Sequence, residues 1–199
     1  PVNSVDVSYE AAKGIGYIKV SKFARNTYNE FITAIAKLKQ AGCTSFVVDL
    51  RGNTGGYMDA AINMINEFMP EGRLIVYTEG KSFPRSDVYA NGTGTCKDAP
   101  IVVLTDEISA SASEIFSGAI QDNDRGTIIG RRTYGKGLVQ TQMSLSDGSE
   151  MRLTIARYYT PSGRCIQKKY EMGNTDAYDQ DIYNRYMHGE FDSADSIKM

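Results

Sequence analysis

Residues 101–121 read IVVLTDEISASASEIFSGAIQ, and the order of side chains in this stretch decides the predicted fold. The opening letters IVVLT are apolar or β-branched, which is typical of a strand buried on both faces of a parallel sheet. The polar segment 106–110 follows, and apolar side chains then recur at helical spacing between Ser111 and Gln121. The stretch therefore predicts a strand, a loop and a helix, and it places Ser111 at the start of that helix.

A strand and a helix are also predicted near the beginning of the chain. Residues 14–20 (GIGYIKV) alternate enough to indicate a strand. Thr27 and Glu30 have the spacing of a capping box, which predicts that a helix begins there, and Gly42 is placed to end it. The apolar face of this helix is predicted to contain Phe31, Ile32, Ile35 and Leu38.

The segment 44–50 (TSFVVDL) repeats the pattern of a buried strand. The loop 51–57 follows it, and a second helix is predicted to end at Pro70 and Gly72. The inward-facing residues predicted for that helix are Ala61, Met64, Ile65 and Phe68.

The remaining segments complete the predicted topology. We expect strands at 74–78 and 126–130, a polar surface excursion at 81–97, and a hairpin formed by 138–143 and 150–159. Strands and helices alternate through the first two thirds of the chain, so the fold class is α/β. Residues 1–170 are predicted to form the core domain, and the acidic, weakly periodic segment 171–199 a peripheral helix and tail.

Composition limits the classes of function that this chain can have. It has 199 residues, 41% of them hydrophobic, which is enough for one α/β core. The net charge of −2 gives no indication of a nucleic-acid partner, and no apolar run reaches membrane-spanning length. The three cysteines are widely spaced and there is one histidine, so we expect no zinc site and largely buried free thiols: Cys43, Cys96 and Cys165.

The pair Ser111 and Lys136 points to hydrolytic chemistry. Ser111 lies in a run of small residues that can expose its hydroxyl, and Lys136 lies between Gly135 and Gly137. A lysine held in a dry site loses its proton more readily, because desolvation disfavours the ammonium form. A neutral amine beside a serine is a nucleophile–base pair that needs no histidine.

Two loops offer backbone amides for an oxyanion. The N–H of Ala112 follows the candidate nucleophile at a helix N-terminus, where backbone donors are unpaired. The glycine-rich segment 49–56 (DLRGNTGG) follows another buried strand, and its amides can approach a substrate closely. Because both loops end parallel strands, we expect them to meet at one edge of the sheet.

Four segments of the chain resemble the carboxyl-terminal processing peptidases, also called tail-specific proteases. They are DLRGNTGG (49–56), SASASEIFSGAIQDNDRG (109–126), GRRTYGKGLVQ (130–140) and YYTPSGRCIQ (158–167). The resemblance runs from about Gly16 to Gln167. It implies a serine endopeptidase that cleaves polypeptides near their C-termini through an acyl-enzyme, with no metal or organic cofactor. It also implies a crotonase/ClpP-like fold of β-β-α units.

The resemblance assigns a role to each matching residue. Ser111 would be the nucleophile, Lys136 the general base, and Gln140 would orient the lysine amine from the same strand face. Glu114 is a difficulty for this assignment, because a carboxylate one helical turn after Ser111 would oppose a neutral Lys136 if it faced the amine.

The same resemblance implies the remaining site residues. The N–H groups of Ala112 and Gly56 would bind the oxyanion, with Gly55 as the alternative to Gly56. Asp122 matches a carboxylate near the family site and is expected to be structural.

The resemblance also predicts the setting in which the chain works. The parent protein would be exported to a bacterial cell envelope, in the periplasm, and would act on polypeptides with apolar C-terminal tails. A homo-oligomer is left open. No PDZ-like module is found in the sequence and Met199 precedes the family's final strand, so we expect a fragment of a longer protein.

Three other interpretations are weighed against the peptidase. Residues 130–136 nearly spell a phosphate-binding loop, but Gly137 stands where a Ser or Thr must ligate magnesium, and a strand is predicted to follow. A Ser-His-Asp triad would need His188, which lies in the weakly periodic tail. A catalytically silent peptide-binding or scaffold domain of the same fold remains as the alternative from another class.

Overall fold

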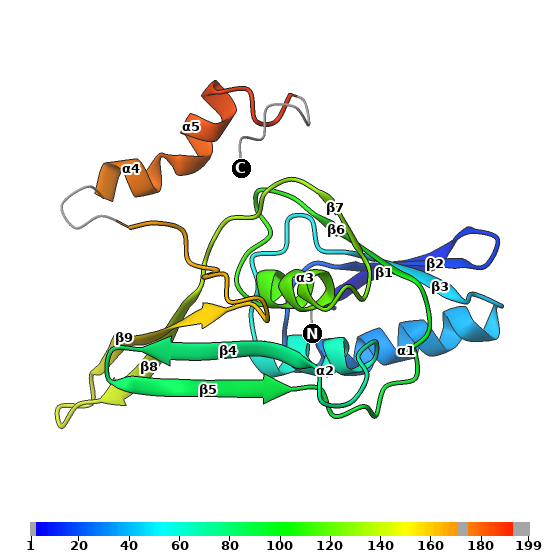
Figure 1. Cartoon of the computed structure of the whole chain (residues 1–199), viewed down its shortest axis with the longest axis horizontal. Helices are drawn as coiled ribbons and strands as arrows, with labels where there is room; N and C mark the ends of the chain where they lie inside the picture. Colours follow the sequence, from blue (N-terminus) through cyan, green and yellow to red (C-terminus); the bar gives the residue numbers. More distant parts are fainter. Residues whose placement is uncertain (1–2, 171–174, 193–199) are drawn as a thin grey trace. The chain divides into compact units, whose positions relative to one another are not determined.

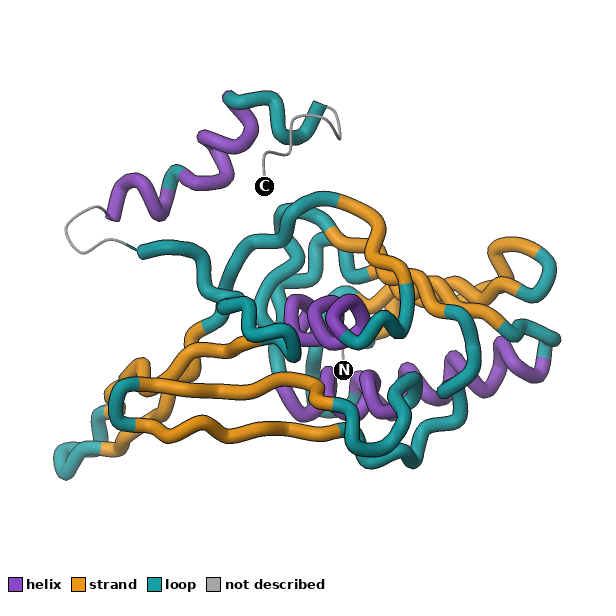
Figure 2. Tube along the Cα trace, viewed as in Figure 1, coloured by secondary structure: helices purple, strands orange, loops and turns teal. Residues whose placement is uncertain are grey.

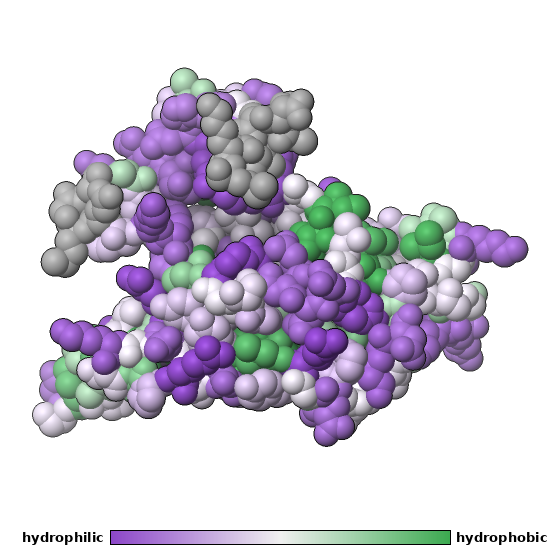
Figure 3. All heavy atoms as spheres, viewed as in Figure 1, coloured by the Kyte–Doolittle hydropathy of each residue, from purple (hydrophilic) through white to green (hydrophobic). Residues whose placement is uncertain are grey.

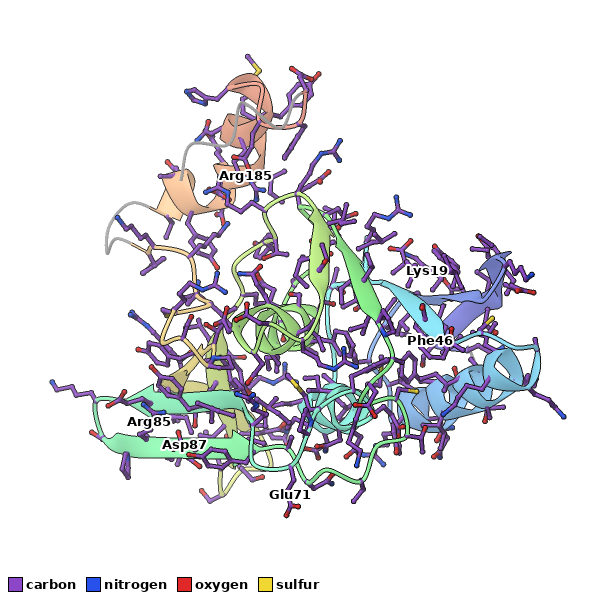
Figure 4. All side chains as sticks on the ribbon, turned by 45° about the vertical axis from the view of Figure 1, so that its right-hand side comes forward. Lys19, Phe46, Glu71, Arg85, Asp87 and Arg185 are labelled. Atoms are coloured by element: carbon purple, nitrogen blue, oxygen red, sulfur yellow. The ribbon has the colours of Figure 1, made fainter. Side chains whose placement is uncertain are left out.

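The computed structural model describes residues 3–170 and 175–192. The chain forms two compact units, Pro1–Gln167 and Lys168–Met199. In the second unit, α4 (Thr175–Asp179) and α5 (Asp181–Met187) are short helices. The buried Arg185 of α5, labelled in Figure 4, forms an ion pair with Glu190 at 2.9 Å.

The first unit contains a mixed five-stranded sheet. Its strand order is β1-β2-β3-β6-β7, in which β1 is antiparallel to β2 and the other neighbours are parallel (Figure 1). This confirms the predicted α/β class and the four predicted strands of this sheet. Lys19 and Phe46 mark the adjacent strands β2 and β3 in Figure 4. The bounds are β1 (Val5–Ala12), β2 (Ile15–Val20), β3 (Ser45–Asp49), β6 (Ile101–Thr105) and β7 (Thr127–Gly130).

A second, antiparallel sheet has the order β5-β4-β9-β8. The predicted hairpin is confirmed as β8 (Leu138–Ser144) and β9 (Glu150–Tyr159). The predicted surface excursion was wrong in part, because β5 (Phe83–Tyr89) pairs with β4 (Leu74–Gly80) as an edge strand. Nearly all β5 side chains are exposed, so no apolar alternation marks the strand.

The polar side chains of β5 contact one another and an aromatic ring of β4, and they do not pack on the hydrophobic core. The Arg85 guanidinium lies 3.8 Å from the centre of the Tyr77 ring, and it pairs with Asp87 at 2.7 Å (Figure 4). The Tyr77 ring in turn stacks on Tyr159 of β9, with 4.9 Å between ring centres. These contacts explain how a polar segment is held as a strand without burying apolar residues.

Three helices cover the sheets of the first unit (Figures 1 and 2). They are α1 (Thr27–Gln40), α2 (Met58–Asn66) and α3 (Ala112–Asp122). Helix α1 packs on β1 and β2, whereas α3 contacts α2, β4 of one sheet and β7 of the other. Residues 112–120 of α3 are all buried, as expected for a helix with neighbours on every side.

The start of α1 differs in detail from the prediction. The helix begins at Thr27, but Glu30 does not form the predicted capping box. Its carboxylate accepts hydrogen bonds from the N–H groups of Ser4 and Val5, at 2.7 and 3.0 Å, where β1 begins. Glu30 therefore links the helix to a strand that the sequence analysis did not predict. The buried face of α1 also differs slightly, with Ala34 buried and Ile32 only half-buried.

The predicted helix end at Gly42 is confirmed for α1, whereas the end predicted for α2 is wrong. Gly42 has φ +95° directly after the α1 C-cap, as a left-handed helix end requires. Helix α2 ends at Asn66, before the predicted stop at Pro70, and Phe68 is buried in the loop that follows.

The surface in view is mostly hydrophilic, with hydrophobic residues in small separate groups (Figure 3). Cys43 and Cys96 are buried and Cys165 is exposed, and all three are free thiols. Within the described ranges, no helix has the length and apolarity needed to cross a membrane.

Candidate active site

The loops that follow β3 and β6 lie against each other. The two strands are adjacent and parallel, with Asp49 opposite Leu104, so both loops leave the same edge of the sheet. The N–H of Ala110 donates to the carbonyl oxygen of Asn53 at 3.0 Å. The N–H of Gly52 donates to the Asp106 carboxylate at 2.8 Å. The expected meeting of the two loops is confirmed.

Asn53 is the central residue of this contact and is fully buried. Its amide nitrogen donates to the Val20 carbonyl at 2.9 Å, and its amide oxygen accepts the N–H of Gly55 at 2.8 Å. Its carbonyl also accepts the Ser113 hydroxyl at 2.9 Å. The sequence analysis did not identify Asn53. The signal available was an Asn inside a glycine loop, where its side chain often bonds the backbone two residues on.

The three serines of the run 109–113 have different environments. The Ser109 hydroxyl is buried and donates to the Leu50 carbonyl at 2.8 Å, and the Ser113 hydroxyl is buried against Asn53. Ser111 is the half-exposed member of the run. Only Ser111 is therefore placed to meet a substrate.

Ser111 has an unusual backbone conformation. Its φ is 56° and its ψ is −113°, a backbone conformation that residues other than glycine rarely adopt. Such strain costs about 1–3 kcal/mol and persists where the surroundings impose it. The next residue, Ala112, opens α3, and its N–H has no acceptor among the described residues.

Gly55 and Gly56 differ in how their amides are used. A Cβ at Gly55 would lie 2.7 Å from Ser111 Cβ and 3.0 Å from Ala112 N, so this loop touches the serine turn. The Gly55 N–H is already bound by Asn53. The Gly56 N–H has no acceptor within residues 3–170 and 175–192, and Gly56 is exposed. The bonding pattern therefore leaves Gly56, and not Gly55, with an amide free to bind a ligand.

The Glu114 carboxylate joins the serine turn to the lysine loop. It accepts the N–H groups of Ser111, Gly135 and Lys136, at 2.8, 2.6 and 2.8 Å. It also accepts the Thr133 hydroxyl at 2.7 Å. Burial raises the pKa of Glu114, and these four hydrogen bonds oppose that rise. The bond from the Ser111 N–H belongs to a capping box, for which the spacing of Ser111 and Glu114 was an available signal, whereas the bonds from residues 133–136 had no local signal in the sequence.

The Lys136 side chain is exposed, so the dry environment expected from its flanking glycines is not formed by the described part of the chain. In that part, no hydrogen bond joins the Ser111 hydroxyl to the Lys136 amine. Lys136 precedes β8, and Gln140 lies inside it as an exposed residue. The structure therefore brings the backbone N–H groups of Ser111 and Lys136 to one carboxylate, without a hydrogen bond between their side chains in the described part of the chain.

An open pocket of about 580 Å³ lies beside the glycine loop. One side of it comes from the first sheet and its loops, and the other side comes from the β8–β9 hairpin. The lining residues are Phe23, Gly56, Tyr57, Gln140, Thr141, Gln142 and Arg152. Gly56 and Gln140 thus line the same pocket.

Asp122 lies at the far end of α3 from Ser111. Eleven residues of helix separate the two, about 16 Å along the axis. Its carboxylate accepts the N–H and the hydroxyl of Ser162, at 3.1 and 2.6 Å, and pairs with Arg164. Burial would raise the pKa of Asp122, but these hydrogen bonds hold it below its usual range.

An ion pair between the buried Asp49 and the exposed Arg51 supports the base of the glycine loop. Asp49 is 1% exposed and accepts the Arg51 guanidinium at 2.6 Å and the Tyr17 hydroxyl at 2.5 Å. Burial would raise the Asp49 pKa, but Arg51, Tyr17 and Lys19 hold it well below its usual range. Burial and the hydrogen bond to Asp49 raise the pKa of Tyr17 to about 12. The sequence analysis did not assign this pair.

The described residues do not form the alternative sites that were considered from the sequence, namely a Ser-His-Asp triad and a phosphate-binding loop. His188 lies in the second unit, where its Nδ1 is 2.6 Å from the Asn184 carbonyl oxygen. The segment after Gly137 is the strand β8, whereas a phosphate-binding loop must lead into a helix. No cluster of His, Cys, Asp and Glu suited to a metal ion occurs in the ranges that the structure describes.

Comparison with known proteins gives a consistent result. The sequence profile described as peptidase family S41 matches residues 14–176. A carboxyl-terminal-processing protease of Synechocystis sp. is 41% identical over 156 residues, which are 78% of this chain and 36% of that protein. A chloroplastic C-terminal processing peptidase of Tetradesmus obliquus is 38% identical over 159 residues, 79% of this chain and 34% of that protein.

A solved structure agrees with these relatives. The photosystem II D1 C-terminal processing protease superposes with a TM-score of 0.74 at 37% identity, covering 79% of this chain and 41% of that protein. The chain thus spans little more than a third of the length of the curated relatives it matches.

Proposed function

The chain belongs to peptidase family S41, and from this premise we propose that it carries the catalytic core of a serine endopeptidase that cleaves polypeptides near their C-termini. One observation carries the proposal. Ser111 is half-exposed on a strained turn that the glycine loop touches at Gly55, and the N–H groups of Ala112, the next residue, and of Gly56, in that loop, have no acceptor in the described residues. A hydroxyl on such a turn with two free amides in the adjoining loops is suited to acyl transfer.

The proposed reaction begins at Ser111. Its Oγ attacks the scissile carbonyl carbon while the neutral Lys136 amine takes the hydroxyl proton. The N–H groups of Ala112 and Gly56 bind the resulting oxyanion, each contributing about 10²–10³-fold in rate. The intermediate collapses to an acyl-enzyme as the leaving amine takes the proton from Lys136. Water then attacks the ester, with Lys136 as base, and releases the Ser111 hydroxyl.

The exposed Lys136 side chain must approach Ser111 for this chemistry. Glu114 fixes the backbone of both residues, so only side-chain rotation is needed to bring amine and hydroxyl together. A bound polypeptide would cover the amine and exclude water, and the Gln140 amide would then orient it. Activity should rise with pH, because only the unprotonated amine accepts a proton.

We place the parent protein, by analogy with the family, in the bacterial cell envelope, in the periplasm. Its substrates would be polypeptides with apolar C-terminal tails, and the names of its relatives support C-terminal processing. The alternative is a peptide-binding domain without catalysis, which the names of the relatives do not favour.

A cleavage assay separates the two candidates. A loosely folded protein with an apolar C-terminal tail is incubated with this chain, with Ser111→Ala and with Lys136→Ala, and the fragments are measured by mass spectrometry. Cleavage that is lost in both variants supports the serine–lysine peptidase. If the unmodified chain is silent, the assay is repeated with the full-length parent, and silence there favours the binding domain.

A further inference from the structure

We propose that Arg152 binds a carboxylate of the polypeptide substrate in the pocket beside Gly56, and that this contact sets the sequence preference of cleavage. The inference rests on the proposed function and adds to it the chemistry of the substrate. It concerns a residue of β9 that has no part in the proton transfers.

Arg152 has no carboxylate partner in the part of the chain that the structure describes. Its guanidinium has no ion pair or hydrogen bond among the described residues, although it lines the pocket. Glu150 is two residues away along β9, but its carboxylate is hydrogen-bonded by the Gln142 amide. An arginine without a carboxylate partner in a concave site favours an anionic ligand.

A second cation contacts one of the lining residues, although it does not line the pocket itself. The Arg25 guanidinium is 5.7 Å from the centre of the ring of Tyr57, which is a lining residue. Arg25 is exposed and makes no ion pair within the ranges described. A further positive charge near the pocket raises the local concentration of an anionic group.

The strands that line the pocket suit an extended peptide. Strand β8 is the edge strand of its sheet, and among the described residues it pairs with β9 alone (Figure 1). Gln142 lies directly opposite Arg152 in the pair, and the consecutive residues 140–142 all line the pocket. A strand edge that contributes consecutive residues can bind a peptide backbone, while pockets along it select side chains.

The position of the pocket relates Arg152 to the scissile bond. A carbonyl oxygen bound to the Gly56 N–H would place the adjoining substrate residues in this pocket, because Gly56 itself lines it. Two carboxylates can then reach the guanidinium: the side chain of a Glu or Asp, or the α-carboxylate of the substrate C-terminus. A guanidinium binds either through two parallel hydrogen bonds.

Matched peptides test the proposal and distinguish the two sources. One set replaces Glu by Gln at each position around the cleavage site, and a second set has a free or an amidated C-terminus. In one of the two sets, we expect kcat/KM to be about 10-fold higher for the peptide that carries the carboxylate than for its neutral partner. The set that shows this difference identifies the source of the carboxylate. In Arg152→Gln this ratio should fall to about 1, and in Arg152→Glu it should invert. Since each ratio is taken within one variant, a general loss of activity cancels.

Two controls make the result decisive. Arg157→Gln makes the same change at an exposed arginine of β9 outside the pocket lining, and should retain the ratio. Peptide affinities measured by fluorescence anisotropy on Ser111→Ala do not require cleavage, so failure of the proposed function leaves this readout intact. A ratio of about 1 for every pair in the unmodified chain, or a ratio that persists in Arg152→Gln, would overturn the proposal.

Discussion

The serine side and the lysine side of the candidate site are built differently. On the serine side, two loops after adjacent parallel strands are tied by Asn53, Ser109 and Asp106, whose hydrogen bonds are mostly buried. On the lysine side, Lys136 and Gln140 are exposed at the start of a hairpin whose outer strand is the edge strand of its sheet. The proposed oxyanion donors thus lie in loops that are tied by hydrogen bonds, whereas the proposed base, Lys136, is exposed.

Glu114 is the link between the two sides. Its carboxylate bonds the backbone of Ser111 and, across the site, the backbone of Gly135 and Lys136. Under the proposed function, the comparison indicates that the fold positions the nucleophile Ser111, whereas the base Lys136 would have to be covered by a bound substrate. The following predictions test this division, beginning with the largest expected effect.

Substitutions at Ser111 should separate activity from stability. Both Ser111→Ala and Ser111→Gly should lower cleavage by about 10³-fold or more, because no other nucleophile is placed there. Ser111→Gly should nevertheless be about 1 kcal/mol more stable than Ser111→Ala, since glycine adopts this backbone conformation without strain. Urea unfolding measures the difference. Equal stabilities would show that the turn is not strained.

Gly56→Ala should disrupt the serine side severely. A Cβ there would lie 2.0 Å from the Phe23 carbonyl oxygen at a φ of +140°, so we expect a loss of about 4 kcal/mol of unfolding free energy. Gly52→Ala is the matched control: its φ is +71°, but the added methyl meets open space, and the loss should be about 1 kcal/mol. Similar losses in both would contradict the close packing around Gly56.

Asp49→Asn should destabilise the base of the glycine loop by about 1–2 kcal/mol at pH 7, because the buried amide cannot replace the charged hydrogen bonds that Arg51 and Tyr17 donate to the carboxylate. The pKa of Asp49 lies below its usual value in the folded state, so its contribution is present above about pH 4 and is lost as the pH falls. The difference in unfolding free energy between variant and parent should therefore shrink below pH 4. A difference that does not change with pH would exclude the ion pair as its cause.

Glu114→Gln should loosen the link between the two sides. The amide has one acceptor oxygen in place of two, so some of the four donors are left unpaired, at a cost of about 2 kcal/mol. Cleavage should fall about 10-fold, because the Lys136 backbone is no longer fixed. The exposed pair of Arg131 with Glu107 provides the control, since Glu107→Gln should change stability by less than about 0.5 kcal/mol. Full activity in Glu114→Gln would refute its positioning role.

The sequence predicted those parts of the fold that bury apolar side chains. The strands β3 and β6 and the helices that follow them are marked by continuous apolar runs and helical spacing. The edge strand β5 was missed because nearly all of its side chains are exposed and no apolar alternation distinguishes it from a loop. Strand β1 was missed although Val5, Val7 and Tyr9 alternate with polar residues, which is a strand signal.

The site was predictable at the level of loops but not of hydrogen bonds. The positions of Ser111, Ala112 and the glycine loop follow from parallel strands ending at one edge. The contributions of Asn53 and Glu114 depend on tertiary contacts with segments 20 or more residues away, which local patterns do not encode. For the same reason, the capping box expected at Glu30 was replaced by hydrogen bonds to β1.

Covalent labelling of Ser111 tests the central claim most directly. The chain is treated with a fluorophosphonate, which reacts with activated serines, and the adduct is located by peptide mass mapping over a range of pH. We predict one adduct, on Ser111, forming faster as the pH rises, and forming about 100-fold more slowly in Lys136→Ala. Labelling of Ser111 at the same rate in Lys136→Ala, or labelling of another serine instead, would contradict the claim that the fold prepares Ser111 as a nucleophile and that Lys136 activates it.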